Sequence, residues 1–164
     1  MTSLQIISRV VAVGCGATLI MDIWLIFLKQ CGVPTLNFAF IGRWGGHVFR
    51  GKFAHASIAK AAPISGELLL GWLIHYAVGI VFAGLLISVC GIAWIATPSL
   101  TPALLIGVST VLIPLLVMQP AMGLGIAASK TPAPFKSCIR SVVNHTIFGL
   151  GLFLSASVIE WIVR

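Results

Sequence analysis

The stretch of sequence that decides the fold is residues 68–129, LLLGWLIHYAVGIVFAGLLISVCGIAWIATPSLTPALLIGVSTVLIPLLVMQPAMGLGIAAS, which contains no Asp, Glu, Lys or Arg. An α-helix needs about 20 predominantly apolar residues to cross the hydrocarbon core of a bilayer. This stretch is therefore long enough for two membrane spans and a turn. The motif TPSLTP at residues 97–102 marks the turn, and Pro102 is expected to open the second of these spans. Pro114 and Pro120 are expected to kink that span.

Two shorter apolar runs flank this stretch and predict two further spans. Residues 10–28 are interrupted only by Asp22, and residues 141–159 contain no charged side chain. We therefore predict an all-α, polytopic membrane protein, a four-helix transmembrane bundle that forms one domain over residues 1–164. The expected spans are residues 8–28, 65–91, 102–129 and 141–162.

The overall composition also indicates a lipid environment. Hydrophobic residues make up 59% of the 164-residue chain and charged residues only 8%, against about 45–50% and about 25% in soluble domains. The net charge of +7 comes from basic residues beside apolar segments, where they are expected to contact anionic lipid headgroups. The bilayer is therefore the expected partner, and nucleic acid is not. The four cysteines have no C-x-x-C spacing, so neither a metal finger nor a disulfide framework is predicted.

The distribution of Lys and Arg predicts how the spans are oriented. Basic residues concentrate in the loops that face the cytoplasm. Only Arg9 and Arg164 lie near the termini, whereas the other eight lie in the first and third connecting regions. Both basic regions are therefore expected in the cytoplasm and both termini outside it. The eight residues are Lys29, Arg43, Arg50, Lys52, Lys60, Lys130, Lys136 and Arg140.

The region between the first and second spans contains a segment that is expected to lie on the membrane surface. Thr35 is a candidate N-cap for a short amphipathic helix that continues to Phe49. A helix with one apolar and one charged face lies along the interface rather than crossing the bilayer. Arg43, His47 and His55 are expected either to stay in this interface or to form a lid over polar groups in the bundle.

The candidate functional site consists of polar side chains at membrane depth. A charged side chain at the centre of a spanning helix costs about 2.5–3.5 kcal/mol on insertion scales, so such residues face the protein interior and often serve a function. Asp22, Glu67, His75 and His145 fall at or within three predicted spans, all in the cytoplasmic half under the predicted orientation. Gln119 lies in the remaining span. We predict that these five side chains form a candidate binding cluster.

Several interpretations of this cluster stay open. Hydrogen bonds between an acid and a histidine would hold the helices together without a ligand. Asp22, His75 and His145 are also candidate ligands for a divalent metal ion, although no closely spaced ligand motif accompanies them. A proton or solute path past the kinked span is a further interpretation. Haem between the two histidines is disfavoured, because they are expected at different depths. No catalytic residue is assigned, because no nucleophile has a base at a diagnostic spacing.

Several short motifs resemble those of a known family. They include GRW at residues 42–44, GEL at 66–68 and MQP at 118–120. Together with further matches, they resemble a bacterial family of uncharacterised membrane proteins catalogued as domain of unknown function 2938. The resemblance covers nearly the whole chain and implies a bacterial inner-membrane protein, without an established activity or cofactor. The further matches are His47, Gly71-Trp72, His75-Tyr76, MGLG at 122–125, Thr131-Pro132, Arg140-Ser141, His145 and FGL at 148–150.

Two functions from different classes fit these observations. In the first, the polar cluster binds or conducts a proton, a metal ion or a small solute. In the second, the chain is a structural or accessory membrane protein whose polar groups only fix helix packing. A membrane-protein partner or a second copy of the chain would then dock on it. An intramembrane enzyme is the third and least favoured class.

Overall fold

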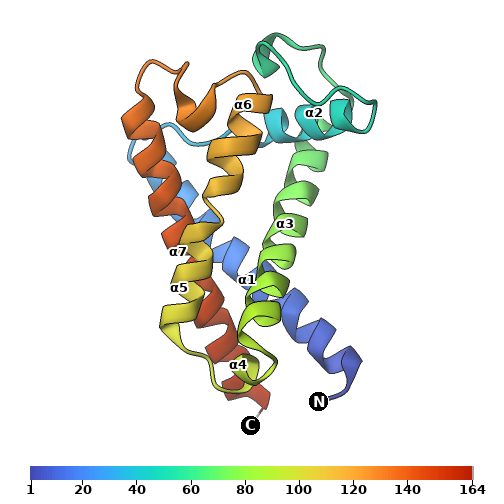
Figure 1. Cartoon of the computed structure of the whole chain (residues 1–164), viewed down its shortest axis with the longest axis vertical. Coiled ribbons are helices and arrows are strands. Elements are labelled where there is room, and N and C mark those ends of the chain that lie inside the picture. Colours follow the sequence, from blue (N-terminus) through green and yellow to red (C-terminus); the bar gives the residue numbers. More distant parts are fainter. Residues whose placement is uncertain (164) are drawn as a thin grey trace. The chain divides into compact units, whose positions relative to one another are not determined.

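A computed structural model of the chain describes residues 1–163 and confirms the all-α fold (Figure 1). It is 75% helical, with no strand among these residues. Four segments are long and apolar enough to cross a membrane, namely Ser3–Gln30, Glu67–Cys90, Leu100–Ala121 and Pro134–Val163. The elements are α1 (Ser3–Gln30), α2 (Phe38–Val48), η1 (Ile58–Lys60), α3 (Glu67–Cys90), α4 (Ala93–Ala96), α5 (Leu100–Ser109), η2 (Pro114–Met118), α6 (Gln119–Ala121), η3 (Ile126–Ala128) and α7 (Pro134–Val163).

The helices divide into two compact units, which are described separately. Unit 1 comprises Met1–Pro34, Tyr76–Thr110 and the described residues from Asn144 onward. Unit 2 comprises Thr35–His75 and Val111–Val143. Unit 1 thus contains α1, α4, α5 and most of α3 and α7. Unit 2 contains α2, α6 with the segments around it, and the first turns of α3 and α7.

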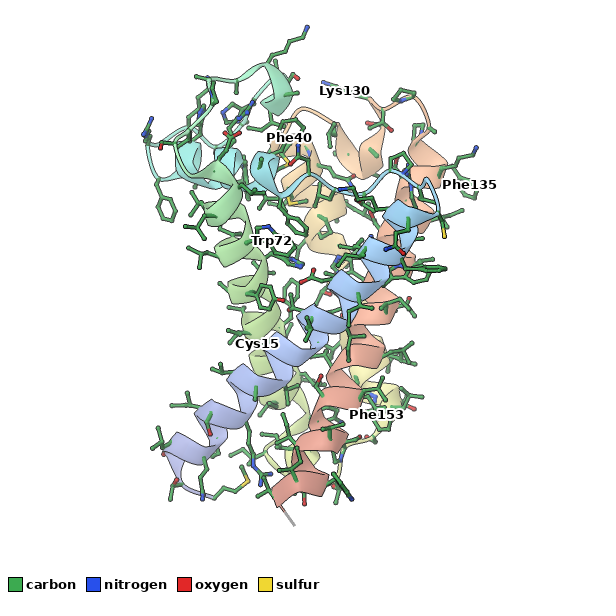
Figure 2. The ribbon with its side chains drawn as sticks, turned by 180° about the vertical axis from the view of Figure 1, so that it is seen from behind. Cys15, Phe40, Trp72, Lys130, Phe135 and Phe153 are labelled. Atoms are coloured by element: carbon green, nitrogen blue, oxygen red, sulfur yellow. The ribbon has the colours of Figure 1, made fainter. Side chains whose placement is uncertain are left out.

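Small residues hold the helices of unit 1 close together. A Cβ atom at Gly79 of α3 would overlap the hydroxyl of Thr18 on α1. A Cβ at Gly151 of α7 would likewise press on the backbone of Ala17 on α1. Such small-residue faces allow helix backbones to approach closely in membranes, where packing rather than water exclusion drives association. Figure 2 shows α1 with the side chains of this unit, among which Cys15 and Phe153 are labelled.

Unit 2 is built on the close packing of α2 against the start of α3. A Cβ at Gly42 would overlap the carbonyl oxygen of Glu67, and one at Gly71 would overlap that of Phe38. The short helix predicted between the first two spans is therefore confirmed. Its N-cap is Asn37 rather than Thr35, because the Asn37 Oδ1 atom accepts a hydrogen bond from the amide of Ala39 at 3.0 Å.

The third span is broken at its prolines, as predicted, and ends earlier than predicted. Pro114 has no amide hydrogen for the carbonyl four residues before it, and α5 stops at Ser109. A π-helical turn, η2, follows over Pro114–Met118 and leads into α6. The span was expected to continue to residue 129, but α6 ends at Ala121, and Gly123 then adopts a φ of +88° that an α-helix does not allow.

The fourth span begins earlier than predicted. The helix α7 starts at Pro134 instead of residue 141, because proline is well suited to a first helical position. The basic segment that was expected to be a loop up to Arg140 is therefore partly helical. The first span likewise starts at Ser3, where Thr2 and Gln5 form a reciprocal capping box.

Candidate functional site

Asp22 is a buried carboxylate in the middle of α1. Its exposed fraction is only 5%, and its Oδ2 atom accepts a hydrogen bond from the Tyr76 hydroxyl of α3 at 2.9 Å. One helical turn earlier, the hydroxyl of the fully buried Thr18 donates to the carbonyl of Gly14. A carboxylate removed from water is retained only when hydrogen bonds compensate for its lost hydration. Tyr76 supplies one of these hydrogen bonds.

His145 pairs with a hydroxyl group in unit 1. The Oγ1 atom of Thr110 lies 2.8 Å from His145 Nδ1 and 2.6 Å from the carbonyl oxygen of Gly107. A hydroxyl group has a single hydrogen, and a carbonyl oxygen can only accept. Thr110 therefore donates to Gly107 and accepts from His145, which places a proton on Nδ1 of the histidine.

Glu67 forms an ion pair with Arg43 in unit 2. The Nε and Nη2 atoms of Arg43 donate to the two carboxylate oxygens at 2.8 and 2.7 Å. The Nη1 atom of Arg43 donates to the carbonyls of Ile58, Ala59 and Ala61 at 3.2–3.3 Å. The hydrogen bonds that Arg43 donates to Glu67 raise the pKa of Arg43 above its ordinary value. This bidentate geometry ties α2 to the first turn of α3 and makes Glu67 an anchoring residue.

His47 and His55 form a directional hydrogen-bonded pair in unit 2. The Nε2 atom of His47 lies 3.0 Å from the carbonyl oxygen of Ala62, so it must donate. In neutral His47, the Nδ1 atom then accepts from the Nε2–H of His55 at 2.8 Å. Burial, followed by the positive charge of His47 in its protonated form and that of Lys52, lowers the pKa of His55, although the Ala121 carbonyl acts in the opposite direction. The neutral form of His55 is therefore favoured.

His75 and Gln119 are the other predicted site residues of unit 2. The His75 ring lies against aromatic side chains, with ring centroids 4.7 Å from Phe38 and 5.9 Å from Trp72 (Trp72 is labelled in Figure 2). Gln119 is 8% exposed, and its buried Oε1 atom has no hydrogen-bond partner within the described structure. A buried acceptor without a donor is costly and marks a position of interest.

The predicted site residues are thus distributed over both units. Asp22 and His145 belong to unit 1, and each bonds a hydroxyl that was not among the residues of the predicted cluster. The residues predicted to form a lid all lie in unit 2. Arg43 forms an ion pair with Glu67, and His47 forms a hydrogen bond with His55. No group of three or more His, Cys, Asp or Glu side chains within residues 1–163 is placed to hold a metal ion.

Two further polar pairs in unit 1 were not predicted. Arg9 of α1 donates to Glu160 of α7 at 3.0 Å, and the indole of Trp24 donates to Asn144 at 3.0 Å. Trp24 lies near the end of the first predicted span, where membrane proteins carry a belt of aromatic side chains. Its partner could not be inferred, because an indole donor has no characteristic spacing to an acceptor on another helix.

Four apolar helices long enough to cross a membrane, with polar side chains paired between them, define a polytopic α-helical membrane protein. The family model described as "Protein of unknown function (DUF2938)" matches residues 11–159. The chain belongs to this family, which confirms the resemblance found in the sequence. No curated protein and no solved structure matched the chain.

Proposed function

We propose that this protein is a multi-pass protein of a bacterial inner membrane that handles a proton through Asp22 and Tyr76. The distribution of basic residues supports an orientation with the basic regions in the cytoplasm and both termini outside. Under this orientation, Asp22 lies within the membrane, nearer the cytoplasmic end of the first span.

The burial of the Asp22 carboxylate within a span carries this proposal. Only 5% of the residue is exposed, and α1 is among the helices able to cross a membrane. Ionisable side chains at this depth are expensive, and in membrane proteins they mark proton relays and ion pathways. The Tyr76 hydroxyl that donates to Asp22 can remain hydrogen-bonded to the protonated carboxyl group as well. Uptake and release of a proton would therefore require little rearrangement of this pair.

A structural or accessory function is the second candidate, and two specific contacts favour it. The Arg9–Glu160 ion pair and the Trp24–Asn144 hydrogen bond both join α1 to α7. Both contacts fix helix packing without any ligand. If the Asp22–Tyr76 pair has the same purpose, removal of the carboxylate will affect stability alone.

A reconstitution experiment tests the proposal and separates the two candidates. The purified chain is placed in liposomes that contain a pH-sensitive dye, and a potassium diffusion potential drives proton entry. We expect the wild type and Glu160→Gln to acidify the lumen, Asp22→Asn to abolish acidification, and Tyr76→Phe to slow it. Glu160→Gln is the matched control, because it neutralises the other acidic side chain of unit 1.

The opposite result would be equally clear. If the wild type conducts no more protons than empty liposomes, while Asp22→Asn lowers the melting temperature in detergent, the structural function is correct. Dye release from the same liposomes must stay at background, so that leakage is not mistaken for proton entry.

A further inference from the structure

A surface loop of unit 2 combines two exposed aromatic rings with two exposed cations. The loop is Phe49-Arg50-Gly51-Lys52-Phe53, directly after α2. Phe49 is 83% exposed and Phe53 is 51% exposed. Arg50 and Lys52 are also exposed, and Gly51 turns the chain with a φ of +80°. Exposed aromatic side chains beside exposed cations are uncommon on a water-facing surface and indicate a binding surface.

The packing of unit 2 sets the depth of this loop. Gly42 of α2 lies directly on the backbone of Glu67, where the second candidate span begins. The ion pair between the side chains of Arg43 and Glu67 joins α2 to the same end of α3. Because α2 packs on the end of a candidate span, α2 and the loop that follows it would lie at the depth of the lipid headgroups in a bilayer that this span crosses.

Trp44 fixes the far end of the loop to α2. Its indole nitrogen donates to the carbonyl oxygen of Phe53 at 2.8 Å, and the two rings meet edge to face with centroids 5.7 Å apart. Four backbone hydrogen bonds, donated by residues 49–52 to carbonyls of α2, hold the near end. The loop is thus presented in one conformation, and its exposed side chains need little further ordering to bind.

We propose that residues 49–53 dock on anionic phospholipid in the bilayer that the helices cross. The rings of Phe49 and Phe53 enter the boundary between headgroups and acyl chains, where aromatic side chains are enriched. Arg50 and Lys52 contact the lipid phosphates, with Arg50 able to bind two phosphate oxygens at once. Lipid is the occupant because the loop lies at headgroup depth and its two charges have the sign opposite to that of the headgroups. This docking does not depend on proton handling by Asp22.

A depth measurement tests the position of the loop directly. Phe49→Cys, in a full-length chain whose four native cysteines are replaced by alanine, is labelled with a nitrobenzoxadiazole dye and reconstituted into nanodiscs. Lipid that carries a nitroxide near the glycerol end of its acyl chain is expected to quench the dye more strongly than lipid with a nitroxide near the chain end. Equal or absent quenching by both lipids would overturn the proposal.

A lipid titration tests the charge preference. Phosphatidylglycerol is added to the wild type in detergent micelles, and the concentration that gives half of the rise in melting temperature is measured. Each removed cation is expected to weaken binding about five-fold, so Arg50→Gln/Lys52→Gln should shift the midpoint about 25-fold. Phe49→Ser/Phe53→Ser should also shift the midpoint upward.

Lys60→Gln is the matched control, because Lys60 is an exposed cation of the same unit without an exposed aromatic neighbour in sequence. The midpoint of its phosphatidylglycerol titration should stay close to that of the wild type. The proposal fails if Lys60→Gln weakens binding as much per removed charge as Arg50→Gln/Lys52→Gln does. It fails as well if inorganic phosphate or phosphatidylcholine stabilises the chain as much as phosphatidylglycerol does. It also fails if both double variants bind like the wild type.

Discussion

Replacement of single glycines in α3 provides the sharpest test of how the helices pack. A Cβ at Gly71 would overlap the Phe38 carbonyl of α2, and backbone atoms cannot move aside as a flexible side chain can. A Cβ at Gly84, in the same helix, would meet only the Cγ1 atom of Val10 at an ordinary 3.9 Å. The two Gly→Ala substitutions therefore differ mainly in the space that receives the methyl group.

The expected magnitude follows from this comparison. Alanine in place of glycine stabilises a helix interior by about 0.8–1.0 kcal/mol, and this gain is the same at both positions. Overpacking against a rigid neighbour costs about 1–3 kcal/mol, and only Gly71→Ala incurs this cost. We therefore expect Gly71→Ala to be less stable than Gly84→Ala by about 1–3 kcal/mol. For a chain of this size, the difference corresponds to about 2–12 °C in melting temperature.

The assay is thermal unfolding of the purified variants in one detergent, supported by the free energy of unfolding from a denaturant titration. Gly42→Ala should behave like Gly71→Ala, since the two glycines lie in the same contact between α2 and α3. The double variant should lose less stability than the sum of the losses in the two single variants, because a shift of α2 that relieves one overlap also relieves the other. Equal stabilities of Gly71→Ala and Gly84→Ala would refute the close approach of α2 to α3.

Three further predictions concern the polar pairs. Tyr76→Phe removes a donor from the buried Asp22 carboxylate and should lower stability by about 1–3 kcal/mol in detergent melts. Thr110→Val removes the acceptor of the His145 Nδ1 proton and should lower stability by about 1 kcal/mol in the same assay. Folding lowers the pKa of His55, so the unfolded chain takes up the proton first as the pH falls. This contribution to stability is complete above the ordinary pKa of 6.5 and decreases as the pH falls from there toward the lowered value. Replacement of His55 by Gln should flatten the dependence of melting temperature on pH in this range.

Controls for these predictions come from the chain itself. Tyr76→Phe keeps the aromatic ring, so a lower melting temperature of this variant results from the loss of the hydroxyl group rather than from a loss of ring packing. If Thr110→Val is neutral while His145→Ala destabilises, the imidazole contributes through contacts other than the threonine. If the dependence of melting temperature on pH is unchanged in His55→Gln, another titratable group is responsible for it.

The membrane fold followed from the sequence because the bilayer imposes a simple rule. A helix satisfies all of its own backbone hydrogen bonds in hydrocarbon, so a long, continuously apolar stretch such as residues 68–129 predicted two spans. Helix ends were less predictable. Thr35 and Asn37 are both good caps, and only the geometry of the entering chain selects Asn37. The third span ends at Ala121 because Gly123 turns the chain, and an isolated glycine in an apolar run does not reveal its φ angle.

The candidate site was predictable in its residue types but not in its partners. Asp22 stood out because a carboxylate in a span is rare, and it is indeed buried. Its partner Tyr76 and the partner of His145, Thr110, are hydroxyl residues that any helix can carry on a lipid or an interior face. Their roles depend on the rotation of two helices about their own axes, which one sequence does not specify. The single tyrosine of the chain, next to His75, was the one available signal.

The π-helical turn over Pro114–Met118 determines where the side chains that follow it point. A turn that holds one extra residue rotates the rest of the helix by about 100° relative to a continuous α-helix. In a span whose outer surface meets hydrocarbon, that rotation decides which side chains face lipid. Gln119 directly follows the wide turn and faces inward, whereas removal of one residue from the turn would carry its amide around toward the acyl chains. The sequence MQP, at residues 118–120, therefore lies where a change of helix geometry sets its orientation.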